Sequence, residues 1–203
     1  MCIAILAPIG RVVDNARLYR GWSINDDGAG FAYVDENDKI VIVKGFDKYG
    51  KFHTAYAAAA EKYSATSPFL VHMRIGSAGD RRTSINTHPF AFTPEEGPAG
   101  ALIHNGTMFY PQGEIAGTPD DRKSDTRIFA EQLGPKLVYE DVKAAADLLE
   151  RVVGYSRLAI LYANREYVIL NEERPGLWLD GVWYSNQGCA LDTAERNREF
   201  YTR

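Results

Sequence analysis

The chain has 203 residues, of which 45% are hydrophobic, and it carries a formal net charge of −4. This length is sufficient for one hydrophobic core, and we expect a single domain over residues 1–203. Basic residues form only short pairs, Arg81-Arg82 and Arg122-Lys123, among acidic and turn residues. Without a basic stripe to follow a phosphate backbone, we expect no nucleic-acid partner.

The apolar stretch at 3–9 is too short to span a bilayer, and no cationic segment precedes it. We therefore expect neither a membrane anchor nor an export signal. The two cysteines, Cys2 and Cys189, lie far apart and belong to no CxxC motif or Cys/His cluster. Free thiols of this kind are typical of a reducing compartment, so we expect a cytoplasmic protein.

Strand patterns dominate the first third of the chain. We expect strands at 2–8, 29–34 and 39–44, with a hairpin turn at 35–38 between the last two. An alanine-rich helix is predicted at 51–63, and a buried strand at 68–74.

Loops and helices follow, and strands close the chain. Residues 75–99 read as loop, and a short strand at 101–106 stops on Asn-Gly. Ser124 is a candidate N-cap for a helix over 125–133. The remaining expectations are a helix over 140–153 and an antiparallel meander of strands at 157–163, 166–170, 177–179 and 182–185. This order predicts an α+β fold in which helices cover the outer faces of antiparallel sheets.

Cys2 directly follows the initiator methionine, and two interpretations of it are open. A buried strand can use cysteine as a small hydrophobic residue. If Met1 is removed, however, Cys2 carries a thiol and a free α-amine, whose unperturbed pKa values are about 8.5 and about 7.7–8.0. The amine can then act as the base for the thiol of the same residue, as it does for an N-terminal threonine nucleophile.

Four other residues, at three places in the sequence, offer partners for such a nucleophile. Asn105 and Gly106 end an apolar strand and could supply a side-chain and a backbone N–H to an oxyanion. Arg74 ends another strand and could bind a carboxylate, while Asp125 begins a helix and could receive an ammonium group. Each also has an ordinary structural interpretation: a turn, a surface ion pair and a helix-terminal charge, respectively.

Several short motifs recur in a definite order between residue 2 and about residue 185. They are MC at the start, DGAGFAY at 27–33, HMRIGSAG at 72–79, NTHPF at 86–90, IHNGTM at 103–108, SDT at 124–126 and WYSN at 183–186. With these motifs in this order, the sequence resembles the class II glutamine amidotransferases, which are N-terminal nucleophile hydrolases. The resemblance implies a four-layer αββα sandwich of two antiparallel sheets.

The resemblance also implies roles for individual residues. Cys2 would attack the side-chain amide of glutamine, with its own α-amine as general base and then as acid to the departing ammonia. Asn105 and Gly106 would form the oxyanion hole. Arg74 would bind the α-carboxylate of the substrate and Asp125 its α-ammonium group.

Two further substrate-binding positions, Ser77 and His88, follow from the same resemblance. The sequence departs from the family where Ile75, Gly76 and Ser77 replace the aromatic residue, small residue and threonine that usually follow the arginine. The segment with His88 is most similar to stand-alone members that resemble γ-glutamyl peptide hydrolases.

Three functions are therefore open. A glutaminase domain would release ammonia to a separate synthetase subunit, because we expect no room for a synthetase domain in 203 residues. A stand-alone γ-glutamyl amide or peptide hydrolase would need no such subunit. A catalytically silent binding module is the third, although the complete set of site residues argues against it.

No cofactor or metal is expected. His72, His88 and His104 show neither HxxxH nor carboxylate spacing, so we expect structural histidines. Cys189 is expected to be an inert thiol.

Overall fold

The computed structural model describes residues 2–76, 84–108, 123–173 and 176–190. Its strands are β1 Ile3–Ala7, β2 Gly28–Val34, β3 Ile40–Phe46, β4 Phe69–Arg74, β5 Phe90–Phe92, β6 Gly100–Asn105, β7 Arg157–Tyr162, β8 Tyr167–Leu170, β9 Leu177–Leu179 and β10 Val182–Tyr184. Its α-helices are α1 Asn15–Ile24, α2 Tyr49–Tyr63, α3 Asp125–Leu133, α4 Tyr139–Ala144, α5 Ala146–Val153 and α6 Gln187–Ala190. Two short 3₁₀ helices are η1 Ser84–Asn86 and η2 Gly134–Lys136.

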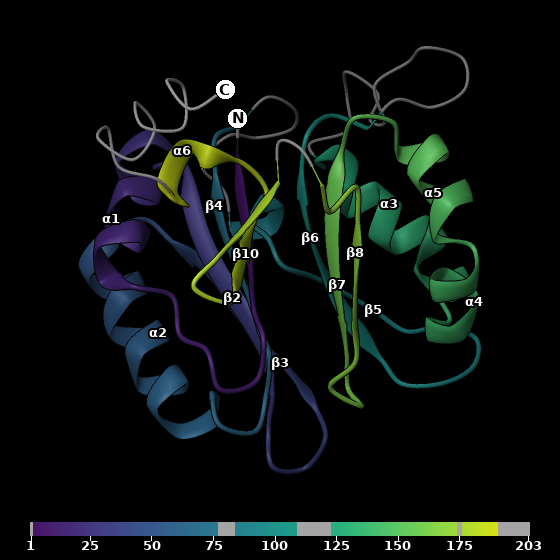
Figure 1. Ribbon diagram of the computed structural model, residues 1–203, viewed down its shortest axis with the longest axis horizontal. Helices are drawn as coiled ribbons and strands as arrows, with labels where there is room; N and C mark the ends of the chain where they lie inside the picture. Colours follow the sequence, from purple (N-terminus) through teal and green to yellow (C-terminus); the bar gives the residue numbers. More distant parts are fainter. Residues whose placement is uncertain (1, 77–83, 109–122, 174–175, 191–203) are drawn as a thin grey trace.

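The strands form two antiparallel sheets. One has six strands in the order β3-β2-β4-β1-β10-β9, and the other has four in the order β5-β6-β7-β8. The sheets stack face to face, with α1 and α2 outside the first and α3, α4 and α5 outside the second (Figure 1). The expected α+β sandwich of two antiparallel sheets covered by helices is thus confirmed.

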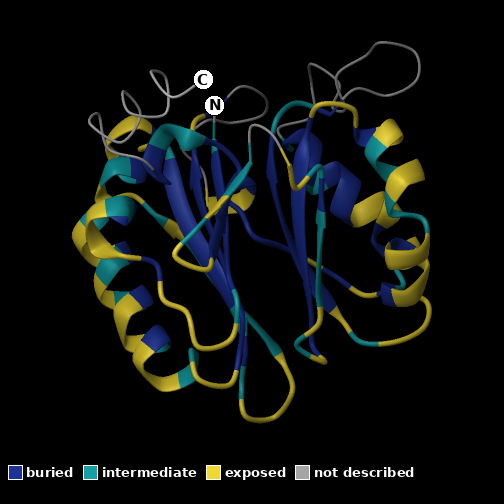
Figure 2. Ribbon diagram, viewed as in Figure 1, coloured by how far each residue is buried: buried dark blue, intermediate teal, exposed yellow. Residues whose placement is uncertain are grey.

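Burial follows from this layering. The strands are buried throughout most of both sheets, whereas the helices expose their outer faces (Figure 2). In β1, Ile3 and Ile5 face the helices, while Ala4 and Leu6 face the other sheet. Because both faces of this strand are covered, its sequence is apolar at every position rather than alternating.

Helix α1 is an element that the sequence analysis missed. Asp14 caps it by accepting a 2.9 Å hydrogen bond from the backbone N–H of Arg17. The helix buries only Leu18 and Gly21, so its apolar pattern is weak. Gly21 packs so closely that an added Cβ would lie 2.7 Å from the sulfur of Met73. The signal for this helix was its cap rather than its periodicity.

Three other expectations need correction. Strand β5 lies inside the expected loop at 75–99. The helix expected over 140–153 breaks at Ala145, so that α4 can bury Tyr139 and Val142 while α5 buries Val153 in the same core. The expected closing meander is split, because β7 and β8 join the four-stranded sheet and β9 and β10 join the six-stranded one. Short strands look alike in sequence, and only their partners decide the sheet.

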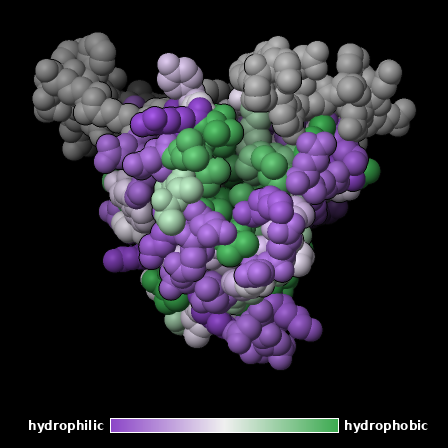
Figure 3. All heavy atoms as spheres, turned by 90° about the vertical axis from the view of Figure 1, so that its right-hand side faces the viewer, coloured by the Kyte–Doolittle hydropathy of each residue, from purple (hydrophilic) through white to green (hydrophobic). Residues whose placement is uncertain are grey.

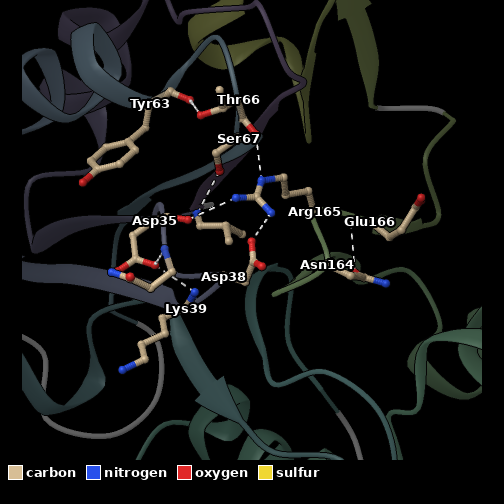
Figure 4. Close-up of polar contacts among 11 residues, drawn as sticks. Asp35, Asp38, Lys39, Tyr63, Thr66, Ser67, Asn164, Arg165 and Glu166 are labelled. Carbon is tan, nitrogen blue, oxygen red and sulfur yellow. Dashed lines mark hydrogen bonds and ion pairs between the residues drawn. The ribbon is translucent and has the colours of Figure 1, made fainter.

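Different chain segments meet at the two ends of the sandwich. At one end, Arg165 in the β7–β8 turn reaches across to the six-stranded sheet (Figure 4). Its guanidinium donates to the backbone oxygens of Thr66 and Asp35, at 2.9 and 3.1 Å, and forms an ion pair with Asp38. This arginine therefore links the two sheets at the end of the sandwich where β2 and β7 end and β4 begins. We call it the distal end.

The outer surface of the four-stranded half carries both hydrophilic and hydrophobic side chains (Figure 3). Helix α5 exposes Leu148 and Val152, with 62% and 63% of their surface accessible. The view onto this side shows hydrophobic surface bordered by hydrophilic side chains (Figure 3). Among the described residues, no helix combines the length and apolar character needed to cross a bilayer.

Candidate active site

A small pocket lies at the end of the sandwich opposite Arg165, where β1 begins and β4 and β6 end. The register brings these termini together, because Ile3 pairs with Met73 and β4 ends one residue later at Arg74. The residues that line the pocket are Cys2, Arg74, Ile75, His88, His104, Gly106, Ser124, Asp125 and Thr126. Five predicted site residues, from five segments of the sequence, thus line one cavity: Cys2, Arg74, His88, Gly106 and Asp125.

Cys2 is partly exposed and its sulfur lies against the backbone that follows Arg74. The Sγ atom lies 3.4 Å from both the N–H and the carbonyl oxygen of Ile75. Burial raises the pKa of the thiol, although the hydrogen bond with Ile75 and the positive charge of Arg74 oppose this rise. The resting group is therefore a thiol that needs a base before it can act as a nucleophile.

Arg74 and Asp125 supply the opposite charges of the pocket, and both are almost fully buried, with 3% and 7% of their surface accessible. Asp125 is the first residue of α3, after the N-cap residue Ser124. One carboxylate oxygen accepts a 2.9 Å hydrogen bond from the N–H of Met108, and the other a 2.7 Å bond from the N–H of Thr126. These bonds hold the carboxylate in place beside the segment that follows Gly106.

Gly106 lines the pocket and has a backbone conformation that favours glycine. Its φ is +147°, and an added Cβ would lie 2.5 Å from Oγ and 2.8 Å from Cα of Ser156. Glycine is required here by both the dihedral angle and the close approach of Ser156, the residue before β7.

Asn105 precedes Gly106 but does not line the pocket. Its side chain is fully buried, and Nδ2 donates a 2.9 Å hydrogen bond to Oγ of Ser185. The amide oxygen Oδ1 is buried without a hydrogen-bond partner among the described residues. The structure therefore places Asn105 next to the pocket-lining Gly106, with its side-chain donor engaged by another side chain.

The three histidines are all buried near this end of the sheets. The ring centroids of His72 and His88 are 3.9 Å apart, and Nδ1 of His104 lies 2.8 Å from Oγ1 of Thr126. Burial lowers the pKa of His72 to about 3 and that of His104 to about 4, and it holds the pKa of His88 well below its usual value. All three imidazoles are neutral at pH 7, so the charge of the pocket comes from Arg74 and Asp125.

Other side chains position the site, and the sequence analysis missed them. Asn186 donates from Nδ2 to the carbonyl oxygen of Cys2 at 3.0 Å, and Asp27 accepts from the N–H of Gly76 at 2.8 Å. Ser185 joins Asn105 to β1, since its Oγ also accepts from the N–H of Ala4 at 2.9 Å. Their sequence signal was membership of the motifs DGAGFAY and WYSN, to which the sequence analysis assigned no role at these positions.

Two further residues were singled out from the sequence. Ser77 lies outside the described residues. Cys189 is fully buried, and burial raises its thiol pKa to about 12, as an unreactive thiol requires. Within the described ranges, no three His, Cys, Asp or Glu side chains converge to hold a metal ion.

Comparisons with known proteins bear on the fold. The sequence matches no protein-family profile and no curated protein. Solved structures are similar, however, and two of them illustrate the likeness. One is the glutamine phosphoribosylpyrophosphate (PRPP) amidotransferase from B. subtilis complexed with ADP and GMP, with 18% identity and a TM-score of 0.59 over 91% of this chain and 42% of that one. The other is described as the allosteric regulatory enzyme of purine biosynthesis, with 16% identity and a TM-score of 0.55 over 91% of this chain and 41% of that one.

At these identities the likeness establishes a common fold. This chain spans about two fifths of the length of either neighbour. The neighbour whose name states an activity is called a glutamine PRPP amidotransferase.

Proposed function

We propose that this chain is a glutaminase-type domain that hydrolyses the side-chain amide of glutamine through a thioester on Cys2. The observation that carries the proposal is the shared pocket of a thiol, a buried guanidinium and a buried carboxylate. A free amino acid presents the matching pair of charges, a carboxylate and an ammonium group. A general amidase would have no use for both.

Before the enzyme can act, Met1 must be removed, which gives Cys2 a free α-amine. That amine accepts the proton of the thiol, whose pKa is raised by burial and therefore needs a base. The thiolate attacks the amide carbon, the C–N bond breaks, and the amine returns its proton to the departing ammonia. Water then attacks the thioester, releases glutamate and restores the thiol.

Binding and transition-state stabilisation fall to different residues. Arg74 binds the α-carboxylate and Asp125 the α-ammonium group, each through charge-assisted hydrogen bonds. The backbone N–H of Gly106 and the amide of Asn105 donate to the oxyanion that forms on the substrate carbonyl. His88 borders the substrate as a neutral imidazole, and Ser77 completes the substrate contacts.

A γ-glutamyl amide or peptide is the second candidate substrate. The same pair of charges binds the α-amino acid end of such a compound, and the leaving group is then an amine or a peptide rather than ammonia. For the glutaminase function, the ammonia passes to a separate synthetase subunit.

A glutamine analogue with a diazoketone in place of the amide tests the nucleophile directly. We expect the intact mass to show loss of Met1 and one covalent adduct, located by peptide mapping on Cys2. Protein with Cys2→Ala is the control and should remain unmodified. An adduct on Cys189, or equal labelling of the control, contradicts the proposal.

A substrate series tests the two charged contacts. Hydrogen bonds to charged groups contribute about 1.5–3 kcal/mol each, so blocking either end of glutamine should lower kcat/KM by about 10- to 150-fold. The comparison uses glutamine, N-acetylglutamine, glutamine methyl ester and a γ-glutamyl dipeptide. Equal turnover of the blocked compounds refutes the roles of Arg74 and Asp125, and faster turnover of the dipeptide favours the stand-alone hydrolase.

A further inference from the structure

Ser185 joins the strand that carries the nucleophile to the residue beside Gly106. It follows β10, is fully buried, and exchanges two hydrogen bonds with Ala4 of β1. Its N–H donates to the oxygen of Ala4, and its Oγ accepts from the N–H of Ala4, both at 2.9 Å. The same Oγ lies 2.9 Å from Nδ2 of Asn105 in the opposite sheet.

Two polar groups around Ser185 lack a hydrogen-bond partner in this arrangement. Oγ of Ser185 accepts two hydrogens, from Ala4 and from Asn105, while its own hydrogen has no acceptor among the described residues. Oδ1 of Asn105 is buried and also lacks a partner there. An unsatisfied buried acceptor costs about 1–3 kcal/mol, so this arrangement of the amide is unfavourable.

Exchanging the two ends of the amide pairs both of these groups and leaves the amide nitrogen as the unpaired group. The oxygen and nitrogen of an asparagine side chain have nearly the same shape, so the exchanged amide fits the same space. Ser185 then accepts from Ala4 and donates to Oδ1 of Asn105, which uses its hydroxyl hydrogen. Nδ2, with both its hydrogens, moves to the side away from Ser185.

We propose that Ser185 is the positioning residue that fixes the amide of Asn105, with its oxygen toward Ser185 and its nitrogen free for the reaction. This inference rests on the proposed function, in which Asn105 donates to the oxyanion. The nitrogen then takes the position at which Oδ1 has no partner among the described residues, where it can donate to the negative oxygen that appears only during the reaction. A hydroxyl suits this role because it accepts from Ala4 and donates to Asn105 at the same time.

A double-mutant cycle measures whether Ser185 acts through Asn105. Loss of one oxyanion donor lowers turnover by about 10²–10³, and a misoriented donor should cost less, so we expect Ser185→Ala to lower kcat by about 10- to 100-fold with little change in KM. In the Asn105→Ala background, the same change should alter kcat by less than about two-fold. An equal loss in both backgrounds would overturn the inference, because Ser185 would then act only through β1.

Two variants separate positioning from folding. Ser67 is also fully buried, and its Oγ accepts from the N–H of Val34 at 2.8 Å, close to the distal end of the sandwich. Ser67→Ala should lower stability without lowering kcat. Ser185→Thr keeps the hydroxyl and should retain most of the activity that Ser185→Ala loses; no recovery in this folded variant contradicts the role of the hydroxyl.

A measurement without substrate distinguishes failure of this inference from failure of the proposed function. In protein labelled with ¹⁵N-asparagine, the side-chain amide signals of Asn105 are identified by their absence from Asn105→Ala. They should shift strongly in Ser185→Ala and stay in place in Ser67→Ala. Unchanged signals in Ser185→Ala overturn the inference, whereas absent glutamine hydrolysis in the unaltered protein counts against the proposed function alone.

Discussion

Substitution of Gly106 by alanine is expected to damage both the stability and the chemistry of the protein. The new Cβ would lie 2.8 Å from Cα of Ser156, about 0.6 Å short of an ordinary contact at 3.4 Å. Since Cα is part of the backbone, no rotation of a side chain relieves this contact. The φ of +147° adds strain that a residue with a Cβ cannot avoid.

The two effects can be given magnitudes. Strain in a sparsely populated backbone region costs about 1–3 kcal/mol, and overpacking costs about 1–3 kcal/mol. We therefore expect urea unfolding to show a loss of about 2–6 kcal/mol. To relieve the contact, the backbone must shift by several tenths of an ångström, which moves the N–H of Gly106. A misplacement of 1 Å can lower a rate by about 10²-fold, so we expect kcat to fall by about 10- to 100-fold.

Gly97 provides the matched control. It has a φ of +90°, but nothing lies within 4 Å of its added Cβ. Gly97→Ala should therefore show the backbone strain without the steric contact and should keep full activity. Unchanged kcat in Gly106→Ala, or an equal loss of stability in both variants, would refute the reasoning.

Three further results are expected. Cys2→Ala and Cys2→Ser should both abolish glutamine hydrolysis while leaving the unfolding midpoint nearly unchanged, because a serine hydroxyl is far less ionised than a thiol; turnover of glutamine by either variant contradicts the mechanism. Arg165→Ala should lower the free energy of unfolding by about 1–3 kcal/mol, through loss of charge-assisted hydrogen bonds at the distal end, without changing kcat; a large fall in kcat would mean that the two ends are coupled. The neutral histidines should make the free energy of unfolding fall as the pH drops below about 6.5, because the histidines of the unfolded chain then bind protons. In the folded chain they bind protons only near their lowered pKa values, about 4 for His104 and about 3 for His72. Each such histidine contributes a slope of up to about 1.4 kcal/mol per pH unit between pH 6 and 4, so His72→Gln should make a plot of unfolding free energy against pH less steep, and an unchanged slope would show that His72 is not buried as a neutral group.

The sequence by itself determined the elements with strong local signals. The apolar runs of β1, β4 and β6 were predicted because strands covered on both faces are apolar at most positions. Ser124 was predicted as a helix cap, and it accepts from the N–H of Arg127 at 3.3 Å. The order of short motifs also pointed to Cys2, Arg74, His88, Gly106 and Asp125, which line one pocket.

Only the tertiary structure decided the pairings and the contacts that support the site. Strands β7 to β10 are short and look alike in sequence, yet they divide between two sheets because each pairs with a different neighbour. Ser185 contacts Asn105 and Ala4 across 80 and 181 residues of sequence, so no local pattern could reveal it. The neutral state of the histidines likewise depends on burial between packed layers. Local sequence fixes which backbone a segment prefers, whereas hydrogen-bond partners and desolvation arise only when distant segments pack together.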